Sequence, residues 1–147
     1  MVGRFILGFG DVENLTYLAL LQLPKDKIFE PASKLSFSNR VDLVRELIAG
    51  RPEIPDDLQK QLSERLSAAK QLSETRNIVA HSPLMMTIYE HPQEGWTHTE
   101  MGLGNAKNKD KAISLENLGA AAEEAEAMAK ELYELYGKVH KHVVKDA

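Results

Sequence analysis

The stretch Ser114–Val143, SLENLGAAAEEAEAMAKELYELYGKVHKHV, is the most regular part of the sequence. Its apolar residues alternate steps of three and four over about four heptads, which places them on one face of a helix. They are Leu115, Leu118, Ala122, Ala125, Ala129, Leu132, Tyr136, Val139 and Val143. Ser114 suits the N-cap, and Glu116 suits the first turn, where the helix dipole favours an acid. The stretch therefore predicts the long closing helix of a bundle, with small central residues that allow a close neighbour.

The first helix is predicted over Val2–Leu23, where apolar residues again recur at steps of three and four. Two glycines interrupt it. Either Gly8 and Gly10 let a neighbouring backbone approach, or they only weaken the first turns. A loop is predicted over Lys25–Ser36, because Pro31 disfavours a helix there.

Two shorter apolar stripes predict the second and third helices. The second helix begins near Ser36 or Ser38, either of which can cap it, and ends at Gly50. The third starts with Pro55, which suits a first helical position, and is stopped by Pro83.

Between the third and the closing helix the pattern changes. Leu84–His91 and Trp96–Leu103 flank the turn-rich Pro92–Gly95, which predicts a β-hairpin, and Gly104–Lys111 is predicted to be a polar loop. The predicted fold class is all-α, an antiparallel four-helix bundle with a small β-hairpin inserted between helices three and four. Residues 1–147 are predicted to form a single helical domain.

Composition restricts the possible functions. The 147 residues are 43% hydrophobic, which is enough for a core, and they include no cysteine, which excludes a disulfide framework, a thiolate metal site and a cysteine nucleophile. The apolar start of the chain contains Arg4, so we interpret it as a core helix and not a signal peptide. A cytoplasmic protein without a membrane partner is expected. The net charge of −4 argues against non-specific coating of nucleic acid.

Three polar residues do not fit a plain bundle. Arg76 follows Leu62 and Ala69 at successive seven-residue steps, so it points to the apolar face of the third helix. Asn77 and His81 lie within contact range of each other, four residues apart, on the same last turns. Burying an arginine is costly unless it is paired or faces a cleft. The cluster therefore predicts a crevice, a subunit interface or a buried ion pair.

A purely structural role is the alternative. Arg76 can pair with Glu13, which flanks the stripe of the first helix, and so fix the bundle. Arg40 is a second candidate for burial and can share the same carboxylate. His81 can simply favour the negative end of its helix dipole.

The run Glu74–Ser82, ETRNIVAHS, resembles the signature of the HEPN superfamily. In that signature an arginine with a polar follower precedes a histidine at the end of the third helix of a bundle. Arg76, Asn77 and His81 match it, with four residues between arginine and histidine. The architecture agrees over nearly the whole chain, and the motif itself covers about eight residues.

The resemblance implies a homodimer in which two such motifs face each other across a cleft. It also implies a metal-independent endoribonuclease of the toxin or antiphage type, with RNA as substrate and a small antitoxin or regulatory protein as partner. The catalytic residues would be Arg76, Asn77 and His81. A histidine can move the ribose 2′-hydroxyl proton, an arginine can stabilise charge on the phosphate, and an asparagine can orient either group.

The superfamily also contains non-catalytic regulators resembling the mannitol operon repressor, so a regulatory or protein-interaction module is the alternative function. Members paired with a nucleotidyltransferase antitoxin carry a tyrosine where this chain has Pro83. No cofactor or metal is predicted. His91 and His98, beside Glu90 on the predicted hairpin, lack the fixed helical spacing of a typical site.

Overall fold

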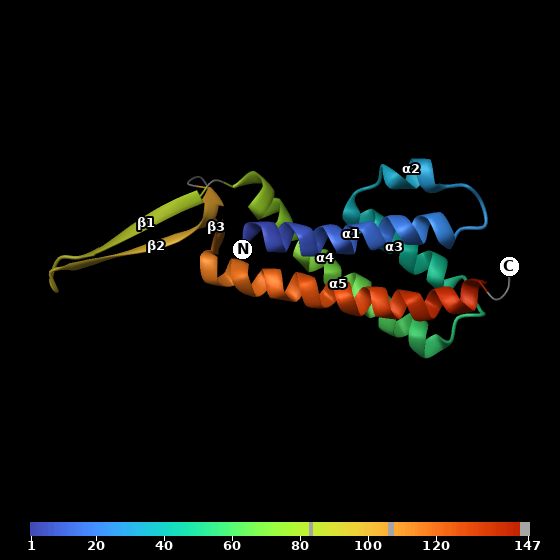
Figure 1. Ribbon diagram of the computed structural model, residues 1–147. Coiled ribbons are helices and arrows are strands. Elements are labelled where there is room, and N and C mark those ends of the chain that lie inside the picture. Colours follow the sequence, from blue (N-terminus) through green and yellow to red (C-terminus); the bar gives the residue numbers. More distant parts are fainter. Residues whose placement is uncertain (83, 106–107, 145–147) are drawn as a thin grey trace.

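The computed structural model describes residues 1–82, 84–105 and 108–144 (Figure 1). Pro83 and the centre of the predicted polar loop lie outside these ranges. The helices are α1 (Val2–Gln22), α2 (Phe29–Ser33), α3 (Phe37–Ala49), α4 (Asp56–His81) and α5 (Leu115–Val144). The strands are β1 (Leu84–His91), β2 (Trp96–Asn105) and β3 (Asn108–Ser114), which form one antiparallel sheet in that order.

Serine caps fix the starts of α3 and α5, at positions that the sequence offered for them. The hydroxyl of Ser36 accepts a hydrogen bond from the backbone of Asn39 at 3.3 Å, and the hydroxyl of Ser114 accepts one from Asn117 at 3.1 Å. Each serine satisfies an amide that has no partner within its helix. After the C-terminal end of α4, Ser82 has an extended backbone, with φ −112° and ψ 131°. These helix boundaries depend on residues that are close in the sequence, so the sequence was sufficient to predict them.

Two elements differ from the prediction. The short helix α2 lies inside the predicted loop, and Pro31 is its third residue. A proline is tolerated there, because amides of the first turn have no intrahelical acceptor. Strand β3 lies where a polar loop was predicted, and it pairs with β2 through Gly102↔Ser114 and Leu103↔Ile113. Backbone pairing of an edge strand requires little apolar side-chain pattern, so periodicity did not reveal it.

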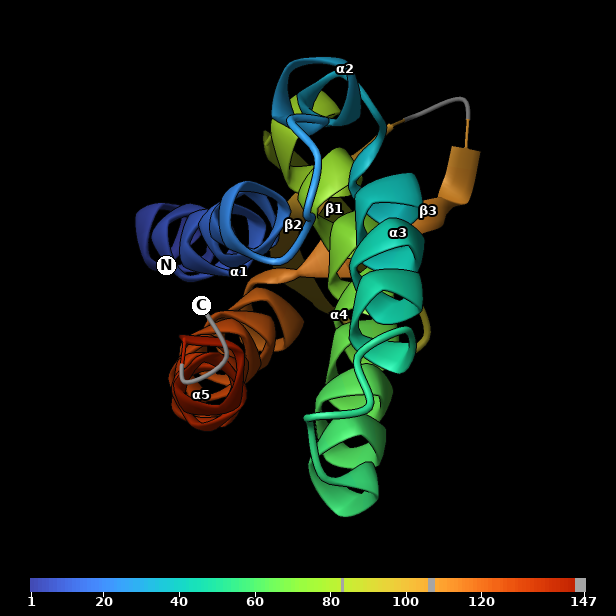
Figure 2. The ribbon, with the colours of Figure 1, turned by 90° about the vertical axis from the view of Figure 1, so that its right-hand side faces the viewer.

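The helix arrangement corrects the prediction of an antiparallel bundle. Helices α1 and α5 lie side by side and run in the same direction (Figures 1 and 2). Arg4 near the start of α1 pairs with Glu126 at 2.8 Å, and Gln22 at its end accepts a hydrogen bond from the Tyr136 hydroxyl at 2.7 Å. The pairing therefore advances along both helices together, as in a parallel pair.

The connection that contains α2 explains this direction. It returns the chain along α1, so that α3 begins beside the first half of α1, with the Phe9 and Phe37 rings 5.0 Å apart. Helix α4 then runs antiparallel to α3, since Asp42 contacts Lys70 while Arg45 contacts Ser63. The sheet follows α4 at the end of the molecule where α1 starts. Helix α5 therefore begins at that end too and runs in the same direction as α1.

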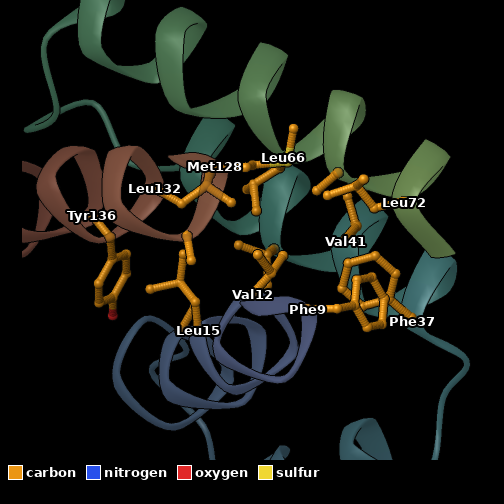
Figure 3. Close-up of a cluster of buried hydrophobic side chains, with 14 of the residues drawn as sticks. Phe9, Val12, Leu15, Phe37, Val41, Leu66, Leu72, Met128, Leu132 and Tyr136 are labelled. Carbon is orange, nitrogen blue, oxygen red and sulfur yellow. The ribbon is translucent and has the colours of Figure 1, made fainter. Parts of the chain in front are cut away.

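The core lies between α1, α3, α4 and α5 (Figure 3). Side chains that meet there include Phe9, Val12, Leu15, Phe37, Val41, Leu66, Leu72, Met128, Leu132 and Tyr136. The last fully buried residue of α4 is Leu72, and in the turns that follow only partly buried side chains such as Val79 still pack against the core. None of the helices within the described ranges is long and apolar enough to cross a membrane.

The predicted hairpin is confirmed. Strands β1 and β2 pair from Leu84↔Leu103 to His91↔Trp96, and the turn contains Gly95 with φ 72°, a conformation that favours glycine. We call residues 84–105 the arm. Figure 1 shows the arm extending away from the helices, which contact the sheet only near its base.

Candidate functional site

Arg76, Asn77 and His81 lie on the last turns of α4, after its final buried residue, Leu72. Arg76 is half-buried, whereas Asn77 and His81 are exposed. The guanidinium of Arg76 donates a hydrogen bond from Nη1 to Oδ1 of Asn77 at 3.4 Å. The prediction that these residues share the end of the third helix is correct. The exposure of Asn77 and His81 follows from their place in these turns, where α4 has no fully buried residue.

The buried ion pair forms at a different arginine. The side chain of Arg40 is only 5% exposed, and its Nη2 lies 3.4 Å from Oε1 of Glu13. Its Nε donates to Thr16 Oγ1 at 3.2 Å and its Nη1 donates to the Leu35 carbonyl at 2.7 Å. Three acceptors thus compensate the cost of burying this guanidinium. The predicted alternative that Arg76 pairs with Glu13 is wrong, because Arg40 occupies that carboxylate.

Arg76 makes no ion pair with any residue that the structure describes. Its neighbours on the predicted apolar stripe are also incompletely covered, since Val79 is half-buried and Ala80 is exposed. Val79 still packs against the core, so the burial of the apolar stripe decreases toward the end of α4 without stopping at Leu72. The last turns of α4 present a partly apolar face with a cationic side chain.

The three side chains supply a guanidinium, an amide and an imidazole. His81 is the last residue of α4, where the negative end of the helix dipole favours a cation. The imidazole can accept or donate a proton near neutral pH, and the guanidinium can bind two oxygens of a phosphate. None of the three residues lines the hollow of about 420 Å³ between α4 and α5, which is formed by Gln61, Glu64, Arg65, Glu131 and Leu135. In one copy of the chain, Asn77 and His81 are therefore exposed and Arg76 is half-buried beside them.

The arm beside this surface is acidic. Residues 84–105 contain Glu90, Glu94 and Glu100 but no lysine or arginine. A phosphate backbone is attracted by lysine and arginine and repelled by carboxylates. The arm is therefore a poor surface for RNA.

The arm carries an aromatic cluster that the sequence analysis did not identify. The Tyr89 and His98 rings stack at 4.6 Å, and the His91 and Trp96 rings stack at 3.8 Å. Nε2 of His91 lies 3.2 Å from Nδ1 of His98. The signal was present in the sequence: each strand has two of these residues two positions apart, which places them on one face. Cross-strand aromatic pairs of this kind stabilise a hairpin.

The two histidines do not belong to a larger ligand set. Within residues 1–82, 84–105 and 108–144, no group of three or more histidine, cysteine, aspartate or glutamate side chains is placed to hold a metal ion. The nearest acidic contact is that of Glu100, whose Oε1 lies 3.8 Å from Nε2 of His98.

Comparisons with protein-family models, with curated proteins and with solved structures found no match for this chain. The resemblance to the HEPN superfamily therefore depends on the motif at the end of α4 and on the order of the helices. It remains a prediction from these features.

Proposed function

We propose that the protein is a HEPN-like homodimer and a metal-independent endoribonuclease that uses Arg76, Asn77 and His81. One observation carries the proposal. The carboxylate that would have given Arg76 a structural role is held by Arg40 instead, at 3.4 Å from Glu13. Arg76 is thereby left beside Asn77 on an accessible helix end, together with His81.

The chemistry follows from the three groups. Neutral His81 accepts the proton of a ribose 2′-hydroxyl, and the 2′-oxygen attacks the adjacent phosphorus. Arg76 stabilises the negative charge that grows on the phosphate oxygens, while Asn77 orients the phosphate. The P–O5′ bond breaks, and a protonated histidine returns a proton to the leaving oxygen. The products are a 2′,3′-cyclic phosphate and a 5′-hydroxyl end.

A second copy completes the proposed site. Asn77 and His81 of one chain are exposed, and water weakens electrostatic stabilisation there. Two motifs facing each other would exclude water and would supply one histidine as base and a second as acid. The dimer is thus part of the mechanism.

The test is cleavage of cellular RNA in excess EDTA, with the product ends identified. We expect cyclic phosphate ends from the wild type and no cleavage by His81→Ala, which should keep its fold because His81 is exposed. His142→Ala is the matched control, since His142 lies in the last turn of the other long helix, α5, and should leave cleavage unchanged. Loss of activity in EDTA, or activity that survives in His81→Ala, contradicts the mechanism.

A toxin role is tested in the same variants. Expression of the wild type should arrest growth of a bacterial host, and His81→Ala should relieve the arrest. A stable dimer that cleaves no RNA and causes no arrest would instead favour the non-catalytic alternative, a regulatory or protein-interaction module resembling the mannitol operon repressor.

A further inference from the structure

Two histidine rings on the arm meet at their nitrogen atoms. Nε2 of His91 lies 3.2 Å from Nδ1 of His98, and both side chains are half-buried, so solvent reaches the pair. Two nitrogens that bind one ion at about 2.0–2.1 Å in tetrahedral geometry lie roughly 3.3 Å apart. The spacing of the two imidazole nitrogens therefore suits two ligands of one metal ion.

The strands that carry the two rings also hold them in place. Each histidine stacks on an aromatic ring of the opposite strand, with centroids 3.8 Å apart for His91 and Trp96 and 4.6 Å apart for His98 and Tyr89. The members of each pair are direct partners in the register of β1 and β2. Side chains fixed by packing lose less entropy when they bind a ligand, so the arm presents two oriented nitrogens.

A carboxylate favours the hydrogen arrangement that a metal ion needs. Oε1 of Glu100 lies 3.8 Å from Nε2 of His98, the ring nitrogen that does not face His91. It favours a hydrogen on Nε2, which leaves the lone pair of Nδ1 directed at His91. Histidine ligands in proteins commonly point their second nitrogen at a carboxylate in this way. Glu90, the acidic neighbour in the sequence, is placed on the other face by strand alternation.

We infer that His91 and His98 form a two-histidine site for a divalent transition-metal ion of the Cu²⁺ and Zn²⁺ class. Imidazole nitrogen suits these ions, whereas Mg²⁺ and Ca²⁺ prefer oxygen ligands. No group of three or more protein ligands occurs in the part of the chain that the structure describes, so water completes the coordination. When the ion binds, the hydrogen shared between the two rings moves to the other nitrogen of its own ring, and both lone pairs turn to the ion.

The ion joins the two strands of a hairpin that extends away from the helices (Figure 1). An isolated two-stranded hairpin is at best marginally stable in water. An ion that binds the paired strands and not the separated ones stabilises the arm by mass action. The site contains none of the residues of the proposed nuclease, so the inference does not depend on RNA cleavage.

The first test uses the fluorescence of Trp96, the single tryptophan of the chain. Paramagnetic Cu²⁺ bound by the pair should quench this indole saturably in tag-free protein, with one ion per chain, because Trp96 stacks on His91. Mg²⁺ should have no effect. His91→Phe and His98→Phe should each abolish the saturable quenching, since phenylalanine keeps a ring for stacking but has no ligand nitrogen.

His142→Phe is the matched control and should be quenched like the wild type, because His142 lies in the last turn of α5. Quenching that rises linearly with Cu²⁺ and never saturates overturns the inference. Saturable quenching that is unchanged in both phenylalanine variants of the arm overturns it as well.

The second test measures amide hydrogen exchange in the arm with and without Zn²⁺. Exchange through opening of the strands should slow by the factor 1 + [Zn²⁺]/Kd, which is about elevenfold at ten times the Kd found by calorimetry. His98→Phe should show no slowing, while its near-ultraviolet circular dichroism keeps the signal of the stacked Trp96. Glu100→Gln should weaken Zn²⁺ binding by about tenfold. Exchange that saturating Zn²⁺ leaves unchanged in the wild type overturns the inference, and RNA cleavage, which is assayed in EDTA, is a separate outcome.

Discussion

Two arginines that the sequence presents as alternatives have opposite roles. Arg40 is enclosed by the Glu13 carboxylate, the Thr16 hydroxyl and the Leu35 carbonyl, whereas Arg76 is half-buried and contacts Asn77. Removing Arg40 leaves these acceptors without a donor, so Arg40→Ala should lower the free energy of unfolding by about 3–5 kcal/mol. Arg76→Ala should change it by only about 0.5 kcal/mol. Urea denaturation measures both, and equal losses would contradict the separate roles.

Tyr136 provides a pH-dependent test at the residue scale. Burial raises the pKa of Tyr136 to about 12, and its hydroxyl donates to Gln22 at 2.7 Å. The folded state therefore favours the neutral phenol. This contribution to stability is fully present below the unfolded pKa of about 10 and is lost as the pH rises toward 12.

Tyrosinate absorbance should show a late-titrating phase, and Tyr136→Phe should remove that phase. An absorbance titration that is the same in the wild type and in Tyr136→Phe at high pH would contradict the burial of this hydroxyl.

At the scale of elements, α1 and α5 depend on one glycine for their close approach. A Cβ on Gly8 would lie 3.1 Å from the backbone nitrogen of Glu126 and 3.2 Å from Cβ of Ala125, whereas a Cβ on Gly10 would meet nothing within 4 Å. Both substitutions by alanine gain helix propensity, which is worth roughly 0.5–1 kcal/mol. Gly10→Ala should therefore raise the melting temperature.

Gly8→Ala should lower the melting temperature, because backbone atoms cannot move aside like the end of a flexible side chain and the two helices have to separate. Thermal melts of Gly8→Ala and Gly10→Ala isolate the effect of the contact, because both variants gain the same helix propensity. A Gly8→Ala protein as stable as Gly10→Ala would show that the contact between α1 and α5 is looser than the structure indicates.

At the scale of the whole molecule, the proposed dimer would link stability to association. If two copies associate, mass action stabilises the folded dimer at higher protein concentration. The melting temperature of the wild type should then rise over a roughly hundredfold range of concentration. A concentration-independent wild type would contradict a dimer that contributes to stability.

The sequence by itself determined the features that depend on near neighbours. The steps of three and four in Leu115–Val143 predicted α5, and the turn at Pro92–Gly95 predicted the hairpin. Ser114 predicted one helix start, and Ser36 or Ser38 predicted another, for which the structure shows Ser36 as the cap. Capping, periodicity and turn chemistry act over a few residues, so they can be read from the chain alone. The grouping of Arg76 with His81 on one helix end follows from the same local geometry.

The tertiary structure alone decided which distant residues meet. Periodicity gives the apolar face of a helix but not the direction of its neighbour, and so the parallel course of α1 and α5 was not predicted. Two arginines could compete for Glu13, and only the start of α3 beside α1 gave that carboxylate to Arg40. Strand β3 pairs mainly through its backbone, which carries no side-chain signature. The partial burial of Arg76 likewise depends on the elements packed around the end of α4, a property of the assembled fold and not of α4 itself.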